Sequence, residues 1–254
     1  MIKGLYSAFS ALEAAWKFQD VLANNISNAN TIGYKRETVV HESFSDVLLT
    51  QTSQSMAPLA KSSRAVVGQI GTGTYVAGVA TDFTNGELQP TGNALDFALD
   101  KGFFAIQTPD GQVYYTRDGR FNRDANGDLV TNAGDHVLDA NGNPMNVPSE
   151  DVSASADGVI TANGQQVGQL MVVSFGANEL QRAGEAYFTS ATPGTPIAGQ
   201  VHQGFLEGSN TSLTTEMTSL MAAQRTFEAN QTILARLDQT LDQAAGQLGQ
   251  FVRQ

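Results

Sequence analysis

The sequence predicts an α+β fold in which long N- and C-terminal α-helices form a coiled-coil-like pair and a central antiparallel β domain separates them along the chain. Apolar residues recur every seven positions in the first and last segments, whereas glycine-containing turns divide the middle into short alternating runs. Four regions follow: a helix with an Asn-rich turn over 1–33, an extended segment with a linker over 34–80, the β domain over 81–205 and a heptad helix over 206–254.

The first helix is predicted from two interleaved seven-residue series. One contains Leu5, Leu12, Gln19 and Ile26, and the other contains Ile2, Phe9, Trp16 and Ala23. The helix then runs into "ANNISNAN", which places four asparagines between positions 24 and 30. Asn side chains can satisfy terminal helix carbonyls and tolerate left-handed backbone, so this stretch is expected to end the helix.

In the middle of the chain the seven-residue spacing of apolar residues stops. Residues 50–64 show no sustained periodicity and are interpreted as a linker or mobile loop. Beyond them, Asp-Gly and Asn-Gly turns recur at short intervals between runs such as "FFAIQT", "VYYTR" and "GQLMVVSF". Turns of this kind join antiparallel strands, because Gly supplies the positive φ that tight hairpins need.

The last segment has the most regular pattern. Six positions lie at seven-residue spacing: Leu213, Leu220, Phe227, Leu234, Leu241 and Leu248. Thr211 or Ser212 is a candidate N-cap, and Glu216 falls in the first turn. A helix from Leu213 to Phe251 would be roughly 58 Å long. That length exceeds a domain of this size, so part of the apolar stripe is expected to contact another chain.

Composition excludes several classes of function. The 254-residue chain has no Cys, so it offers no disulfide or thiolate site. Its net charge of -11 argues against nucleic-acid binding. Residues 82–160 hold 13 Asp or Glu against 4 Lys or Arg, which indicates a solvated acidic surface. No apolar run is long enough to span a membrane, and Glu13, Lys17 and Asp20 interrupt any cleavable signal segment.

No pattern for catalysis, a cofactor or a metal emerges. His41, His136 and His202 are far apart in sequence and lack ligand spacing. The segment 139–150 resembles an EF-hand loop, but Pro144 occupies the position where that loop needs Gly. We therefore predict that the protein is not an enzyme and binds no cofactor or metal.

Four ordered stretches resemble the bacterial flagellar rod and hook proteins. They are "LANNISNANTIGYKR", the long run from "IGTGTYVAG" to "YYTRDGRF", "QGFLEGSN" and "EMTSLMAAQRTFEANQTIL". The resemblance covers nearly the whole chain. Within the family, the length and the single β domain are most similar to the distal rod protein, with the proximal rod protein as the alternative. A hook protein would usually carry a further outer β domain.

The resemblance implies a structural role. Members of the family are axial proteins whose terminal helices pack into an inner tube, and this implies a helical homopolymer that transmits torque. The implied partners are further copies, proximal rod and hook subunits, and the flagellar export apparatus, with no nucleic acid and no membrane insertion. The implied location is the extracytoplasmic part of the basal body, in the periplasm or cell-wall zone, reached without a cleavable signal peptide.

The candidate assembly interface combines the heptad positions with two amides of the Asn-rich turn. Its members are Leu5, Phe9, Leu12, Trp16, Asn25, Ile26, Asn28, Leu213, Leu220, Phe227, Leu234, Leu241 and Leu248. Replacing Asn25 and Asn28 with Ala is expected to impair polymerisation while the β domain stays folded. Two other hypotheses remain open: a ligand-binding β module on a helical oligomerisation stalk, and a hydrolytic enzyme with a site that the sequence does not reveal.

Overall fold

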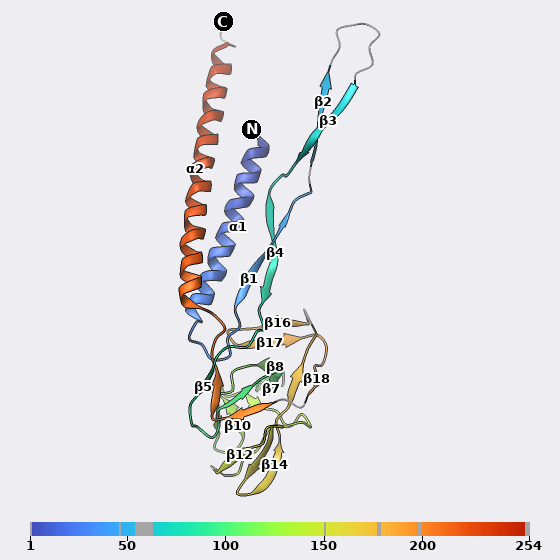
Figure 1. The fold of residues 1–254 in the computed structure, drawn as a ribbon, viewed down its shortest axis with the longest axis vertical. Coiled ribbons are helices and arrows are strands. Elements are labelled where there is room, and N and C mark those ends of the chain that lie inside the picture. Colours follow the sequence, from blue (N-terminus) through green and yellow to red (C-terminus); the bar gives the residue numbers. More distant parts are fainter. Residues whose placement is uncertain are drawn as a thin grey trace. The chain divides into compact units, whose positions relative to one another are not determined.

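The computed structural model describes residues 2–45, 47–53, 63–149, 151–176, 179–197 and 200–251. The chain divides into two compact units. The helix unit comprises Met1–Asn24, Glu37–Thr81 and Thr214–Gln254, and the β unit comprises Asn25–Arg36 and Asp82–Leu213. The α+β class predicted from the sequence is confirmed, with a helix near each end and antiparallel strands between them (Figure 1).

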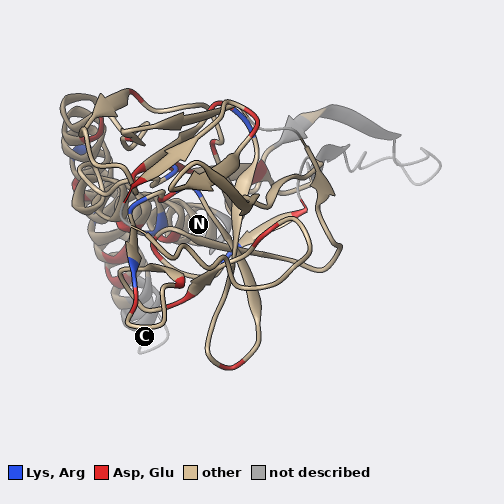
Figure 2. Cartoon of the chain, turned by 90° about the horizontal axis from the view of Figure 1, so that it is seen from below, with Lys and Arg blue, Asp and Glu red and all other residues tan. Residues whose placement is uncertain are grey.

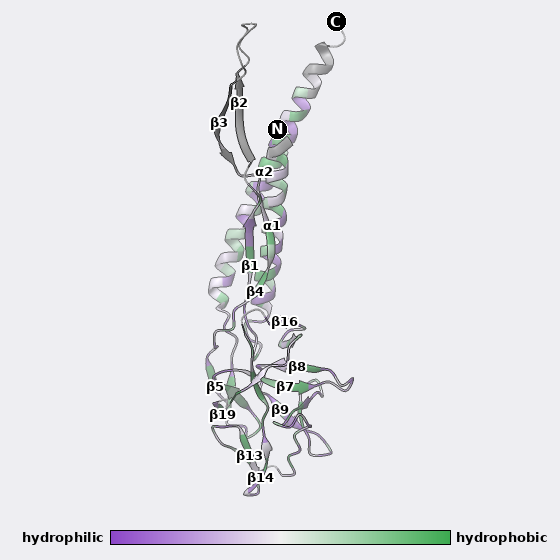
Figure 3. Cartoon of the chain, turned by 90° about the vertical axis from the view of Figure 1, so that its right-hand side faces the viewer, coloured by the Kyte–Doolittle hydropathy of each residue, from purple (hydrophilic) through white to green (hydrophobic). Residues whose placement is uncertain are grey.

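Two helices and two strand pairs build the helix unit. Helix α1 spans Ile2–Ser27 and α2 spans Leu213–Phe251. The two helices lie next to each other (Figures 1 and 3), and residues of both line one shallow pocket. Strand β1 (Glu37–Ser43) pairs with β4 (Thr74–Thr81), and β2 (Val47–Ser53) pairs with β3 (Ser63–Ile70). Neither of the described helices combines the length and apolar character that crossing a membrane requires.

The extended region differs in part from the linker that the sequence suggested. Residues 50–53 belong to β2 and residues 63–64 belong to β3, so the predicted linker boundaries were too wide. The remaining residues of that linker, 54–62, lie outside the described part of the chain. Residues 50–64 show no sustained hydrophobic periodicity, so local patterning did not predict these strands.

The described residues of the β unit form sixteen short strands. In chain order they are β5 (Leu88–Pro90), β6 (Phe97–Leu99), β7 (Phe103–Gln107), β8 (Val113–Thr116), β9 (Phe121–Arg123), β10 (Leu129–Thr131), β11 (His136–Val137), β12 (Val152–Ala154), β13 (Val159–Ala162), β14 (Gln165–Gln169), β15 (Val172–Ser174), β16 (Leu180–Arg182), β17 (Tyr187–Ser190), β18 (Thr195–Pro196), β19 (Val201–Gln203) and β20 (Phe205–Glu207). Every described pairing is antiparallel, as the recurring hairpin turns predicted.

One sheet organises this unit. Nine strands join in it, along the path β16-β17-β8-β7-β11-β10-β9 with β15 and β18 attached through β7. The core of the unit is rich in aromatic rings. Phe97, Phe104 and Phe121 are fully enclosed, and the centroid of the Phe121 ring lies 6.1 Å from that of Phe97 and 5.2 Å from that of Phe104. Asp and Glu outnumber Lys and Arg over the chain, 25 to 14, and many lie in the loops (Figure 2).

Candidate functional site: a buried polar cluster and two helix faces

The Asn-rich turn lies at the end of α1 and folds inward. The Tyr34 hydroxyl donates to Asn25 Oδ1 at 3.0 Å, and the Thr31 hydroxyl donates to Asn28 Oδ1 at 3.1 Å. Asn25 is 0% exposed and Asn28 is 8% exposed. These amides therefore shape the turn within the β unit. The expectation that they offer their hydrogen-bonding groups to neighbouring copies does not fit this burial, and Ala at both positions should also destabilise the β unit.

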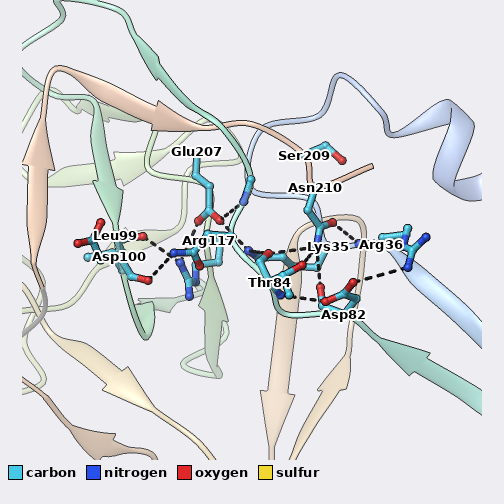
Figure 4. Close-up of polar contacts among 12 residues, drawn as sticks. Lys35, Arg36, Asp82, Thr84, Leu99, Asp100, Arg117, Glu207, Ser209 and Asn210 are labelled. Atoms are coloured by element: carbon cyan, nitrogen blue, oxygen red, sulfur yellow. Dashed lines mark hydrogen bonds and ion pairs between the residues drawn. The ribbon is translucent and has the colours of Figure 1, made fainter. Parts of the chain in front are cut away.

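A buried ionic cluster follows the turn (Figure 4). Lys35 Nζ lies 2.7 Å from Glu207 Oε1, and Arg117 Nη1 lies 2.9 Å from Glu207 Oε2. All three side chains are at most 5% exposed. Two cations thus share one carboxylate away from water, where removing one partner leaves a buried charge without compensation.

Backbone groups complete the cluster. Lys35 Nζ also donates to the Thr84 carbonyl at 2.7 Å, and Arg117 Nη1 donates to the Leu99 carbonyl at 3.0 Å. The Gly86 N–H donates to Glu207 Oε1 at 2.9 Å. Burial lowers the pKa of Lys35, an effect that the Glu207 carboxylate opposes, and burial likewise lowers the pKa of Arg117. The cluster ties segments that are distant in sequence to a single carboxylate.

Asn210 holds a second set of segments together. Its Nδ2 donates to the carbonyls of Asp82 at 2.9 Å and Thr84 at 3.1 Å, and its Oδ1 accepts from the Arg36 N–H at 2.7 Å (Figure 4). The Asp82 N–H in turn donates to the Arg36 carbonyl at 2.8 Å. The chain leaves the β unit at Arg36 and re-enters it at Asp82. The hydrogen bonds of Asn210 therefore hold these two residues next to each other.

Arg182 adds an aromatic contact to the same region. Its guanidinium lies 4.4 Å from the centroid of the Tyr34 ring and 5.7 Å from that of Phe188, and its Nη2 donates to the Lys35 carbonyl. Guanidinium groups stack well on aromatic faces because they are planar and weakly hydrated. Tyr34 is thereby held between Asn25 and Arg182.

The geometry of the cluster is that of a structural element. Lys35 Nζ, Arg117 Nη1 and both Glu207 carboxylate oxygens are bonded to protein groups, whereas Arg117 Nε is buried without a hydrogen-bond partner among the described residues. No nucleophile and base lie together in the cluster. Among the residues that the structure describes, no three His, Asp or Glu side chains gather as a metal site would require. In the EF-hand-like segment, Asp139 Oδ1 accepts from the N–H groups of Asn141 and Asn143, as an Asx turn does.

The predicted interface residues of α1 fall on different sides of the helix. Phe9 is 60% exposed and Trp16 is 61% exposed, whereas Leu5, Leu12 and Ile26 are partly buried. Tyr6, which was not included in the predicted interface, is 68% exposed.

The heptad residues of α2 are mostly turned inward. Leu220, Phe227, Leu234 and Leu241 are partly buried, while Leu213 is 45% exposed. The Leu248 side chain lies outside the described part of the chain. Met217 and Met221, at 51% and 53%, are more exposed than the heptad positions and were not included in the predicted interface.

The sequence patterns missed the buried cluster. Glu207 and Lys35 are 172 residues apart, and Glu207 and Arg117 are 90 residues apart, so no local spacing connects them. A usable signal existed, because all three residues, and Asn210, lie inside the stretches "TIGYKR", "YYTRDGRF" and "QGFLEGSN" on which the family resemblance rests.

The fold and these sites define a structural protein class: a self-contained β unit combined with helices whose apolar faces are incompletely covered. Family models agree with this class. The chain matches the flagella basal body rod protein model over residues 5–35, the flagellar hook protein FlgE/F/G D1 domain over 100–162 and the flagellar basal body rod FlgEFG protein C-terminal model over 202–247.

Similar proteins extend along nearly the whole chain. The flagellar basal-body rod protein FlgG of Bacillus subtilis is 35% identical, covering 96% of this chain and 98% of the relative. The flagellar hook-basal body complex protein FlhO of the same organism is 32% identical over 99% of this chain and all of the relative. The flagellar basal-body rod protein FlgF of Mesorhizobium japonicum is 34% identical, covering 98% of this chain and 99% of the relative. The chain belongs to the flagellar basal-body rod protein family.

Proposed function

We propose that this chain is a structural subunit of the bacterial flagellar basal-body rod, of the distal type, and that it assembles into a helical tube that transmits torque to the hook. The observation that carries the proposal is the exposed apolar surface of α1 and α2 in a chain whose relatives include several FlgG rod proteins. Large apolar side chains left in water favour association, because burying one stabilises a complex by about 1.5 to 3 kcal/mol before entropy is counted.

Cohesion in this proposal comes from many parallel contacts between helices. A rod of indefinite length needs heterologous contacts, in which one surface of a subunit meets a different surface of the next, because self-complementary contacts close into dimers. Leu5, Phe9, Leu12, Trp16, Ile26 and the described heptad residues of α2 remain the proposed interface. Asn25 and Asn28 would support it indirectly, by fixing the turn that ends α1.

The proposed partners are further copies of this chain, proximal rod and hook subunits, and the flagellar export apparatus. The proposed location is the extracytoplasmic part of the basal body, in the periplasm or cell-wall zone. Membership of a family of flagellar axial proteins supports both.

A proximal rod protein is the alternative within the family. Labelling purified hook-basal bodies with an antibody against the β unit separates the two assignments. We expect label on the half of the rod next to the hook. Label restricted to the half next to the cell would assign the chain to the proximal rod, and a basal body without label would contradict rod membership.

A ligand-binding β module on an oligomerisation stalk is the less favoured function. It predicts an oligomer of fixed size, whereas a rod subunit grows with concentration. Light-scattering mass measured for the full-length protein across a concentration series distinguishes them. A mass that rises without a plateau supports the rod subunit, and a constant small oligomer favours the stalk.

A further inference from the structure

A cavity of about 400 Å³ lies in the β unit, beside the buried ionic cluster. Part of its lining is aromatic, because the ring centroid of Phe103 lies 5.6 Å from that of Phe83 and 6.1 Å from that of Phe175. Arg117 and Lys101 line the same cavity. Its volume lies in the range of pockets that hold small molecules, and apolar walls with a few polar groups are typical of such pockets.

Arg117 leaves part of its hydrogen-bonding capacity unused. Its Nη1 donates to the Leu99 carbonyl and to Glu207 Oε2. Within the described part of the chain, neither its Nε nor its Nη2 has a hydrogen-bond partner. The side chain is only 5% exposed, so water has little access to these N–H groups. A buried donor without an acceptor is costly, and a ligand that supplies an acceptor here would therefore be stabilised.

The unused nitrogens share one edge of the planar guanidinium group. This edge, formed by Nε and Nη2, can bind a carboxylate through two parallel N–H···O hydrogen bonds. Nη2 is the first donor, because Nε is completely enclosed and Nη2 is not. Phe103 supports the group from one face, with 5.0 Å between its ring centroid and Arg117 Cζ. The edge is thus held in position before a ligand binds.

Lys101 supplies a second cation at the cavity. It is exposed, and none of the described residues forms a hydrogen bond or ion pair with it. Two carboxylates nearby oppose an incoming anion. Asp100 lines the cavity with its Oδ1 3.0 Å from His202 Nε2, and Glu179 accepts a hydrogen bond from the N–H of Gly176, another lining residue. Both carboxylates are engaged by these partners, so the donors of Arg117 and Lys101 stay available to a ligand.

We propose that this cavity binds a small soluble carboxylate with an apolar or aromatic body. The carboxylate accepts hydrogen bonds from the Nη2 and Nε edge of Arg117, and Lys101 attracts its charge. The body of the ligand packs against Phe83, Phe103 and Phe175. An inorganic anion would satisfy the donors but not the aromatic lining. The inference goes beyond the proposed rod function, and neither depends on the other.

Ligand-observed fluorine NMR on the full-length protein tests the site, with para-fluorobenzoate as the probe. We expect para-fluorobenzyl alcohol, which has the same ring without the charge, to bind about tenfold more weakly. Inorganic phosphate should displace the probe only at about tenfold higher concentration than unlabelled benzoate does. No binding of the probe, equal binding of the alcohol or equal competition by phosphate would overturn the inference.

Variants test whether the probe binds in this cavity. Lys101→Gln removes an exposed cation without changing the buried cluster and should weaken binding about threefold. Arg123→Gln, at an exposed cation of β9 that does not line the cavity, is the matched control and should bind normally. Phe175→Ala should weaken binding about tenfold through the lost ring contact. Unchanged binding by Lys101→Gln and Phe175→Ala would overturn the assignment to this cavity.

Arg117→Lys keeps a cation beside Glu207 but removes the planar edge, so it should weaken binding most, by more than about tenfold. Thermal unfolding shows whether this variant is folded. If it is not, the Lys101 and Phe175 variants decide the outcome, because neither residue belongs to the buried cluster. A folded Arg117→Lys protein that binds the probe normally would overturn the inference.

Binding at different degrees of assembly separates a soluble ligand from a side chain of another subunit. We expect the probe to bind equally well at the lowest and highest concentrations of the light-scattering series. Loss of binding in the assembled protein would overturn the soluble ligand and assign the cavity to a carboxylate of a neighbouring subunit. A basal body without label would contradict the rod function and leave the result of the binding experiment unchanged.

Discussion

The two units differ in how completely they bury their large apolar side chains. In the β unit, rings such as Phe97, Phe104 and Phe188 are completely enclosed, and even its charged residues Lys35 and Glu207 are buried and paired. In the helix unit, by contrast, Phe9 and Trp16 stand in water, and few side chains are fully buried. The β unit therefore buries its large apolar side chains within one chain, whereas the described part of the helix unit leaves several of them exposed.

The β1–β4 pair of the helix unit also leaves apolar side chains exposed. Val40 of β1 and Tyr75 and Val79 of β4 are exposed, as is Phe44, which directly follows β1 and whose ring lies 5.1 Å from that of Tyr75. A two-stranded ribbon is marginally stable without a packed face. Changes in the β unit should therefore act on folding of the subunit, and changes on the helix unit should act on assembly.

The largest loss of stability is expected from a substitution of Glu207. Glu207→Gln leaves Lys35 and Arg117 as buried cations without a counter-charge and should lower the free energy of unfolding by about 3 to 5 kcal/mol. Denaturant titration followed by near-ultraviolet circular dichroism measures it. Glu87→Gln, an exposed carboxylate of the same unit, is the control and should change little. An unchanged midpoint for Glu207→Gln would show that the cluster does not support the fold.

The next largest loss of stability is expected from a glycine substitution in the β unit, whereas a matched substitution in the helix unit should have little effect. In the β unit, a Cβ on Gly119 would lie 1.7 Å from the Phe97 carbonyl oxygen, so Gly119→Ala should cost about 2 to 3 kcal/mol. In the helix unit, a Cβ on Gly78 of β4 meets no atom within 4 Å, and Gly78→Ala should stay within about 0.5 kcal/mol. Similar losses for both variants, measured by thermal unfolding, would contradict the contrast in packing.

A dependence of stability on alkaline pH is expected from Tyr187 in the β unit. Burial, reinforced by the hydrogen bond that Tyr187 donates to Asp135 at 2.7 Å, raises the pKa of Tyr187 to about 12. The unfolded chain ionises this group near its ordinary pKa of 10, so its contribution to stability is complete below pH 10 and is lost as the pH rises toward 12.

Tyr187→Phe tests this dependence. The variant should lose the part of the decline in unfolding free energy between pH 10 and 12 that Tyr187 causes, while the other tyrosines keep theirs. Chemical denaturation at a series of alkaline pH values measures the slope. Tyr6→Phe in the helix unit is the matched control. A slope that is the same in Tyr187→Phe and the original protein would assign the decline to other groups.

The smallest effect on stability is expected from substitutions of exposed aromatic residues of α1, which should nevertheless strongly reduce assembly. Phe9→Asp and Trp16→Asp change side chains that are already exposed, so the free energy of unfolding of the monomer should shift by less than about 0.5 kcal/mol. Light scattering should show that neither variant forms large assemblies. Val113→Asp, at an exposed apolar position of β8, should leave assembly intact. Normal growth of the Phe9 and Trp16 variants would remove these residues from the interface.

The sequence by itself determined both helices, the antiparallel character of the middle and the family. Heptad spacing and Asp-Gly or Asn-Gly turns are local signals, readable because the residues that interact lie a few positions apart. Only the tertiary structure decided which residues meet across long distances: that Glu207 receives Lys35 and Arg117, that Asn210 holds Arg36 and Asp82, and that Asn25 faces inward. Strand register fixes such pairs, and register depends on how all strands pack together.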